Sequence, residues 1–245
     1  MGETTLNPEP KTPISFEQVR TAFTVFKSDY NIVAHPETPI NTPFNRPNGP
    51  DATGHRQYNL TTIPADMTEA DFLAQIEDPA GVVVAIGCMD KDAALPAYEV
   101  LKTENPDKKI VYITVAGGIV QKEQERIDAM RTILTYVSQH QEHVEAVIAT
   151  DHDHTCGKIK VDLGGTALAE KIGAEVPNPG QNASQEEQEK MKSLIAGGVT
   201  EVGLPTLFPG KLKQGLVQID REGSASIDYG FEGVQPQTIN QLIDG

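Results

Sequence analysis

Three short runs of β-branched and other apolar residues constrain the fold of this chain most strongly. They lie at 82–87, 110–115 and 144–150. Helical patterns at 93–104 and 122–140 separate them, and the second of these has its apolar residues on one face. Strands that alternate with helices favour parallel pairing, and strands that are apolar on both faces fit a sheet covered on both sides. The sequence therefore predicts an α/β fold with a mostly parallel central sheet flanked by helices.

The C-terminal part predicts a further helix and an antiparallel edge. A capping-box pattern begins at Ser184, and the helix that follows is predicted to stop at the glycine pair 197–198. The segments 215–220 and 224–229 flank a turn that contains a glycine. This pattern predicts a β-hairpin, which would add antiparallel strands at one edge of the sheet.

The N-terminal part has a different character, and we predict a boundary between an extension at 1–66 and an α/β domain at 67–245. The extension is predicted to hold a helix at 15–30 and a long loop rich in proline and glycine at 31–66. A capping box at Ser15 opens the helix. One face of this helix carries its apolar residues at helical spacing: Phe16, Val19, Phe23 and Phe26. This face packs either on the chain's own domain or on a second subunit, so we expect a homodimer or a higher homo-oligomer.

Composition excludes several classes of partner. The formal net charge of the 245 residues is −15, whereas binding to nucleic acid or to an anionic membrane surface relies on clustered Lys and Arg. No apolar run approaches the ~20 residues of a membrane span, and the first residues lack the pattern of a signal peptide. Two cysteines do not form a disulfide framework. We therefore expect a cytoplasmic protein that acts on a small molecule.

Residues that bind metals follow two of the three predicted strands directly. Cys88 and Asp90 come after the first strand, and His152, His154 and Cys156 come after the third. In open parallel sheets, ligands bind beyond the carboxyl ends of the strands, where these side chains would meet if the two strands are neighbours. Thiolate, imidazole and carboxylate are the groups that zinc prefers, and it takes four of them in a tetrahedron. The sequence predicts a zinc site formed by both cysteines, one of the two histidines, and either Asp90 or water.

The chain resembles the β-class carbonic anhydrases in four segments that occur in the same order. The segment 86–90 is similar to that family's strand ending in Cys-x-Asp, and 115–120 is similar to its segment after the next strand. The segment 152–157 resembles its His-x-x-Cys-Gly motif, and 215–223 resembles its C-terminal hairpin. The resemblance covers roughly residues 81–230.

This resemblance implies a zinc lyase that hydrates carbon dioxide reversibly to bicarbonate. It assigns Cys88, His152 and Cys156 as zinc ligands, with His154 as the alternative to His152. Asp90 would either orient the nucleophile as the catalytic carboxylate or occupy the fourth ligand position itself. A site closed by four protein ligands is structural or inhibited, since catalysis requires an open position.

Two departures from the family pattern affect these assignments. The family histidine lies three residues before the second cysteine, where this chain has Asp153. The family pattern Cys-x-Asp-x-Arg pairs the aspartate with an arginine, but this chain has Asp92 in place of the arginine. An arginine of the long loop, Arg46 or Arg56, could restore the pair. The second departure weakens the expectation of catalysis more than the expectation of zinc binding.

Three functions therefore remain open at the level of sequence. The first is a carbonic anhydrase with weak or altered activity. The second is a zinc hydrolase of another small molecule, such as carbonyl sulfide or carbon disulfide. The third is a zinc-binding protein on the same scaffold that catalyses nothing.

Overall fold

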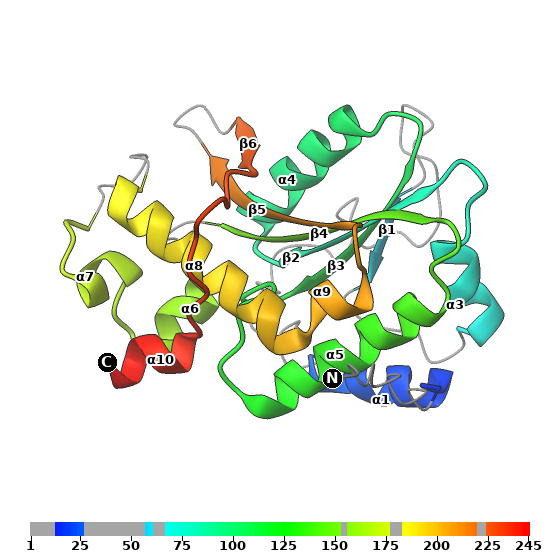
Figure 1. The fold of residues 1–245 in the computed structure, drawn as a ribbon, viewed down its shortest axis with the longest axis horizontal. Coiled ribbons are helices and arrows are strands. Elements are labelled where there is room, and N and C mark those ends of the chain that lie inside the picture. The colour runs from blue at the N-terminus through cyan, green and yellow to red at the C-terminus, as the bar shows by residue number, and fades with distance from the viewer. Residues whose placement is uncertain (1–12, 27–56, 61–66, 153–155, 177–182, 220–223) are drawn as a thin grey trace, which may run out of the picture.

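A six-stranded sheet forms the centre of the molecule (Figure 1). The computed structural model describes residues 13–26, 57–60, 67–152, 156–176, 183–219 and 224–245. Within these residues the strand order is β1-β3-β2-β4-β5-β6. The strands are β1 (Gln57–Leu60), β2 (Val82–Cys88), β3 (Lys109–Val115), β4 (Val144–His152), β5 (Leu212–Ile219) and β6 (Ala225–Asp228).

Pairing in the sheet is parallel except at one edge, as the sequence predicted. Strands β1 to β5 pair in parallel, and β6 pairs antiparallel with β5 to form the predicted hairpin. Among the described strands only β6 is antiparallel, because β5 itself runs parallel to β4. The strand β1 lies inside the segment 31–66, where the sequence predicted a loop. Its residues Gln57–Leu60 pair with residues 110–113 of β3 at the other edge of the sheet.

Helices cover both faces of the sheet. In Figure 1, α4 lies on one side of the sheet, and α5, with α1 outside it, lies on the other. The helix α4 begins at Lys91 rather than at the predicted residue 93. No helix in the described ranges is long and apolar enough to span a lipid bilayer. The helices are α1 (Phe16–Val25), α3 (Glu69–Ile76), α4 (Lys91–Glu104), α5 (Gln124–Gln139), α6 (Gly157–Asp162), α7 (Leu168–Ile172), α8 (Gln185–Val202), α9 (Leu204–Leu207) and α10 (Ile239–Asp244).

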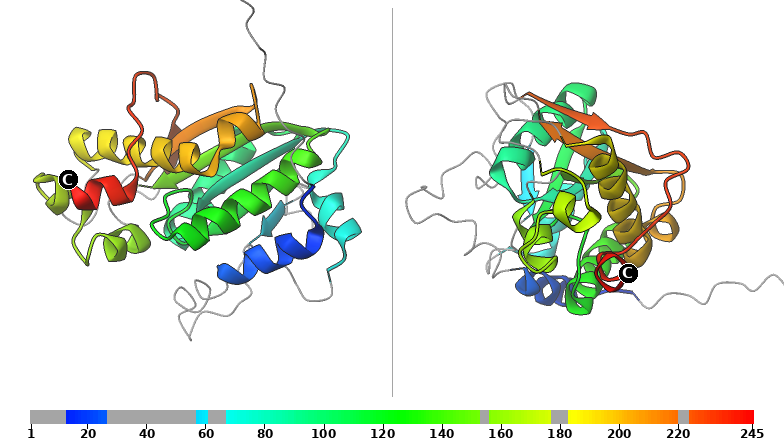
Figure 2. Two further views of the ribbon diagram at one scale, coloured as in Figure 1. Left: turned by 60° about the horizontal axis from the view of Figure 1, so that its bottom comes forward. Right: turned by 90° about the vertical axis from the view of Figure 1, so that its left-hand side faces the viewer.

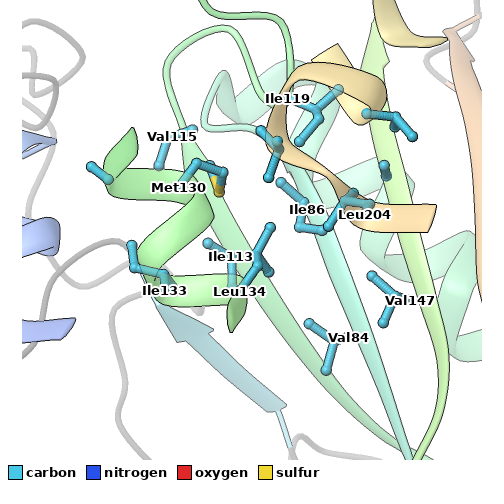
Figure 3. Close-up of a cluster of buried hydrophobic side chains, with 14 of the residues drawn as sticks. Val84, Ile86, Ile113, Val115, Ile119, Met130, Ile133, Leu134, Val147 and Leu204 are labelled. Atoms are coloured by element: carbon cyan, nitrogen blue, oxygen red, sulfur yellow. The ribbon is translucent and has the colours of Figure 1, made fainter. Parts of the chain in front are cut away.

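The two faces of the sheet bury separate apolar clusters. In β2 the side chains alternate, so that Val84 and Ile86 face α5 while Val83 and Ala85 face α4. Figure 3 shows the cluster on the α5 side, where Leu134 of α5 lies over β2 and β3. Each aliphatic side chain buried in this way contributes about 1.5–3 kcal/mol to folding. Burial on both faces explains why these strands are apolar along their whole length.

The N-terminal helix α1 packs on the chain's own domain. Ser15 forms the predicted capping box with Gln18, and the helix ends at Val25 with Phe26 as its C-cap. The ring of Phe16 lies 5.5 Å from that of Phe72 of α3, and all four residues of the apolar face are buried. Figure 2 shows α1 lying along α5 in both views. The apolar face is therefore covered without a second subunit. The oligomer stays a prediction, and the burial of this face gives no support to it.

The glycine pair 197–198 does not end helix α8, contrary to the sequence prediction. The helix continues through both residues to Val202 and ends at Gly203, which has a φ of 84°. A β-carbon on Gly197 would lie 2.2 Å from the carbonyl oxygen of Gln237, and one on Gly198 would lie 2.4 Å from that of Ile119. The two glycines therefore allow other segments of the chain to approach the middle of the helix closely.

Candidate metal centre

The order of the strands places the switch point of the sheet at the carboxyl ends of β2 and β4, and we call this place the crevice. From β2 the chain passes through α4 to β3 on one side, and from β3 it returns through α5 to β4 on the other side of β2. The two connecting helices therefore cover opposite faces of the sheet. Ligands of open α/β sheets bind where the chain reverses direction in this way. The structure confirms that β2 and β4 are neighbours. The sequence analysis expected the candidate ligands to meet only if these two strands were adjacent.

The two strands separate just before the crevice. Their pairing ends at Ile86 and Ala149, although each strand continues for further residues. Beyond this point the Thr150 hydroxyl donates a hydrogen bond of 2.9 Å to the carbonyl oxygen of Ile86. A β-carbon on Gly87 would lie 2.3 Å from Oη of Tyr112 and 2.7 Å from Oγ1 of Thr150. Two hydroxyl groups thus fill the space beside the glycine and hold the strand ends in place.

We expect Thr150→Val to destabilise the protein by about 1–3 kcal/mol. Valine has nearly the same shape as threonine, but it leaves the buried carbonyl of Ile86 without this donor, and unpaired buried polar groups cost that amount. Thr150→Ser keeps the hydroxyl and serves as the matched control. The measurement is the free energy of unfolding in urea. Equal stability of the two variants would contradict this role of the hydroxyl.

Four side chains meet in the crevice, and their ligand atoms all lie within 4.8 Å of one another. Cys88 is the last residue of β2, and Asp151 and His152 are the last two residues of β4. Cys156 is the N-cap of α6, which follows β4. All four are buried, with exposed fractions of 5 % or less. The end of one strand, the end of its neighbour and the start of one helix therefore fix the positions of the four groups.

The distance between the two sulfur atoms fits a shared metal ion. Sγ of Cys88 lies 3.8 Å from Sγ of Cys156, and both cysteines are free. This distance is far longer than the ~2.05 Å of a disulfide bond. Two sulfur atoms bound ~2.3 Å from one ion at the tetrahedral angle would lie about 3.8 Å apart. The sulfur atoms are thus spaced as ligands of one tetrahedral ion.

The protonation equilibria of the four groups also favour a cation. The hydrogen bond between the two cysteines lowers the pKa of Cys88 and raises that of Cys156. Burial raises the pKa of Asp151 to about 8, and the charge of Cys88 adds to this shift. Burial opposes the charged form of His152, but its hydrogen bond to Cys88 and the charge of Cys88 raise its pKa to about 9. The raised pKa values keep protons on Asp151, His152 and Cys156, and a metal ion that binds there can displace these protons.

The carboxylate of Asp151 has one oxygen atom available for a ligand. Its Oδ1 accepts a hydrogen bond of 2.8 Å from the backbone N–H of His152. Its Oδ2 is buried and has no hydrogen-bond partner among the residues that the structure describes. The backbone of Gly118 flanks this atom, since a β-carbon on Gly118 would lie 3.0 Å from Oδ2 and 3.0 Å from the backbone nitrogen of Cys88. A buried acceptor of this kind, beside two sulfur atoms and an imidazole, fits the ligand set of zinc.

The structure brings three of the predicted ligands together and adds one that the sequence analysis missed. Cys88, His152 and Cys156 belong to the group, and Asp151 is the fourth member. Asp90 lies two residues beyond Cys88 and is partly buried, outside this group of four. Its predicted role as catalytic carboxylate or fourth ligand stays a prediction. The signal that could have indicated Asp151 is its place at the end of the strand, directly before the histidine.

Several residues to which the sequence analysis gave a role lie outside the described part of the chain. His154, the alternative ligand, is one of them, and so are Arg46 and Arg56, the proposed replacements for the family arginine. Asp92 lies in the first turn of α4, but its side chain is not described. The account of the missing arginine therefore stays a prediction.

Comparison of the chain with models of protein families, with curated proteins and with solved structures finds no match. The interpretation of the centre therefore depends on its own residues and geometry.

Proposed function

We propose that this protein binds zinc and catalyses the reversible hydration of carbon dioxide to bicarbonate, in the manner of the β-class carbonic anhydrases. Cys88, His152 and Cys156 would hold the ion. The observation that carries the proposal is the 3.8 Å contact between the two sulfur atoms, in a crevice where an imidazole and a carboxylate also lie within 4.8 Å. The resemblance of the four sequence segments supports the choice of reaction.

The donor set favours zinc over other common metals. Two thiolates and one imidazole are soft or intermediate ligands, which suit zinc, whereas magnesium and calcium select oxygen ligands. When bound, zinc supplies a Lewis acid that makes water nucleophilic near neutral pH. The burial of the centre keeps bulk water away from the charges and strengthens the interactions between them.

Asp90 is the residue of the chain that we assign to the reaction itself. It follows the ligand Cys88 by two residues, in the connection between β2 and α4, and it is only partly buried. A carboxylate at this place can accept a hydrogen bond from the attacking water and so orient it toward carbon dioxide. The proton that the reaction releases then has a route to solvent along the exposed side of this residue.

A second function is favoured by the fourth member of the group. Asp151 completes a set of two sulfurs, one nitrogen and one oxygen, which can close a tetrahedral zinc site. A closed site has no position for water, so the protein would then bind zinc without catalysing hydration. The metal would in that case stabilise the fold, as structural zinc does.

Stopped-flow measurement of carbon dioxide hydration by the zinc-loaded protein tests the proposal. Parallel assays of sulfide release from carbonyl sulfide and carbon disulfide test the hydrolase that the sequence left open. Hydration with no sulfide release supports the anhydrase. One zinc per chain with neither reaction supports the non-catalytic protein. A protein that takes up no zinc would contradict all three functions.

We expect Asp92→Arg to raise the rate of carbon dioxide hydration. In the family that the chain resembles, an arginine at this place pairs with the aspartate and keeps it from the metal. A guanidinium can bind a carboxylate through two hydrogen bonds, which an aspartate at position 92 cannot do. The measurement is kcat/KM at neutral pH, beside Asp92→Lys as the control for charge alone. Rapid hydration by the unmodified protein, unchanged by the arginine, would contradict this account.

A further inference from the structure

A turn of the backbone forms one wall of the metal centre, although none of its residues is a candidate ligand. The turn follows β3, and its Gly117 and Gly118 have φ values of 77° and 52°. A β-carbon on Gly118 would lie 2.8 Å from the carbonyl oxygen of Thr150, besides its approach to Cys88 and to Oδ2 of Asp151. The carbonyl of Val115 links the turn to the ligand segment, since it accepts hydrogen bonds from the backbone N–H groups of Gly118 and Met89, each at 3.0 Å.

A buried glutamine holds this turn in place. Nε2 of Gln121 donates to the carbonyl oxygens of Ala116 and Gly118 at 2.9 and 2.8 Å. Its Oε1 accepts a hydrogen bond of 2.5 Å from Nε of Arg126. The exposed fraction of Gln121 is 1 %. Both donor hydrogens of the amide are therefore used on the two carbonyls of the turn, and its orientation is fixed by the arginine.

Arg126 connects the same turn to the N-terminal helix. Its Nη2 donates to the carbonyl oxygen of Ala116 at 3.2 Å, and its guanidinium lies over the ring of Phe26, 4.9 Å from the centroid. Phe26 is the fully buried C-cap of α1. A guanidinium stacked on an aromatic ring is attracted to the face of the ring and loses freedom to move. The chain of contacts thus runs from α1 through Arg126 and Gln121 to Gly118.

We propose that Gln121 and Arg126 are positioning residues of the metal centre. They hold the backbone of Gly118 against Asp151, and so fix the carboxylate that lies beside the two sulfur atoms and the imidazole. This inference rests on the proposed metal binding, but not on the reaction. Loosening the turn frees Asp151 and, with it, the end of β4 that carries the ligand His152, so that the ion dissociates faster.

The test measures cobalt, which replaces zinc and can be observed by its visible absorption. Cobalt(II) is added to the metal-free protein, and its absorption spectrum and its rate of transfer to excess EDTA are recorded. Gln121→Glu keeps the shape of the side chain and its acceptor for Arg126, but turns an oxygen instead of an N–H group toward two carbonyls. Gln124→Glu makes the same change on the exposed face of α5 and serves as the control.

We expect Gln121→Glu to shift the cobalt bands and to speed metal loss about tenfold, whereas Gln124→Glu should do neither. A tenfold effect is at the lower end of the range seen when residues that support metal ligands are replaced. Phe26→Leu removes the ring beneath Arg126 without exposing the core, and should change both readouts in the same direction to a smaller extent. A wild-type spectrum and rate in Gln121→Glu and Phe26→Leu, with lower thermal stability alone, would overturn the inference. If the unmodified protein binds no cobalt or zinc, the proposed function fails, whereas wild-type binding with unchanged variants contradicts only the positioning role.

Discussion

Replacing either cysteine of the crevice by serine is expected to reduce the retained zinc from about one ion per chain to almost none. Cys88 and Cys156 come from separate elements, and their sulfur atoms lie 3.8 Å apart, so each variant leaves a single thiolate. A serine hydroxyl does not lose its proton near neutral pH and cannot replace a thiolate as a ligand. Because the binding of metal contributes to folding where its ligands join different elements, we also expect zinc to raise the melting temperature of the unmodified protein only.

The measurement is elemental analysis after dialysis against a weak chelator, combined with thermal unfolding with and without zinc. Met89→Leu serves as the control, because it removes a sulfur atom directly beside Cys88 without touching the group of four. Full retention of zinc by both serine variants would exclude the crevice as the binding site. Loss in one variant only would show that the two sulfur atoms do not share one ion.

Gly118→Ala is expected to destabilise the protein by about 2–5 kcal/mol and to prevent metal binding. An alanine at a φ of 52° costs about 1–2 kcal/mol because its β-carbon crowds the backbone. The remainder comes from overpacking, since the added carbon would lie 2.8 Å from the carbonyl of Thr150 and 3.0 Å from the nitrogen of Cys88. Backbone atoms of both strands must move to accommodate it, and the ligand groups move with them.

Gly164→Ala separates the two contributions. Gly164 also has a positive φ, 79°, but it is exposed, and a β-carbon added to it would have nothing within 4 Å among the described residues. It should therefore show the conformational cost alone and bind zinc normally. Urea unfolding and zinc titration of both variants give the comparison. Equal losses of stability, with zinc binding intact in both, would show that Gly118 is not packed against the centre.

The central strands and most of the candidate centre could be predicted from the sequence because their signals are local. A run such as 82–87 is apolar on both faces only where helices cover both sides of a sheet, and the structure confirms that environment. The residues that follow such runs must lie at the edge of the sheet. Cys88, His152 and Cys156 could therefore be placed near one another before their side chains were seen.

The other features depend on contacts between distant parts of the chain. In the sequence, Asp151 looks like a polar residue of a loop. It joins the group of four candidate ligands because β2 and β4 separate beyond Ile86. The glycines at 197–198 are poor helix formers, so the sequence indicated the end of a helix. In the structure the helix continues, and Gly197 is needed because the backbone of Gln237 approaches it closely. The strand β1 has no apolar pattern that distinguishes it from its loop, and it forms where β3 offers an unpaired edge.

The sulfur atoms that meet in the crevice are 68 positions apart in the chain. Between them lie α4, β3, α5 and β4, so their contact closes a loop that contains two strands of the sheet. Closing a long loop costs chain entropy before the contact can repay it. The two thiols therefore come together only when β2 and β4 are already side by side. Binding of metal at this place would mark chains in which β2 and β4 are already side by side, and would leave chains without this pairing unbound.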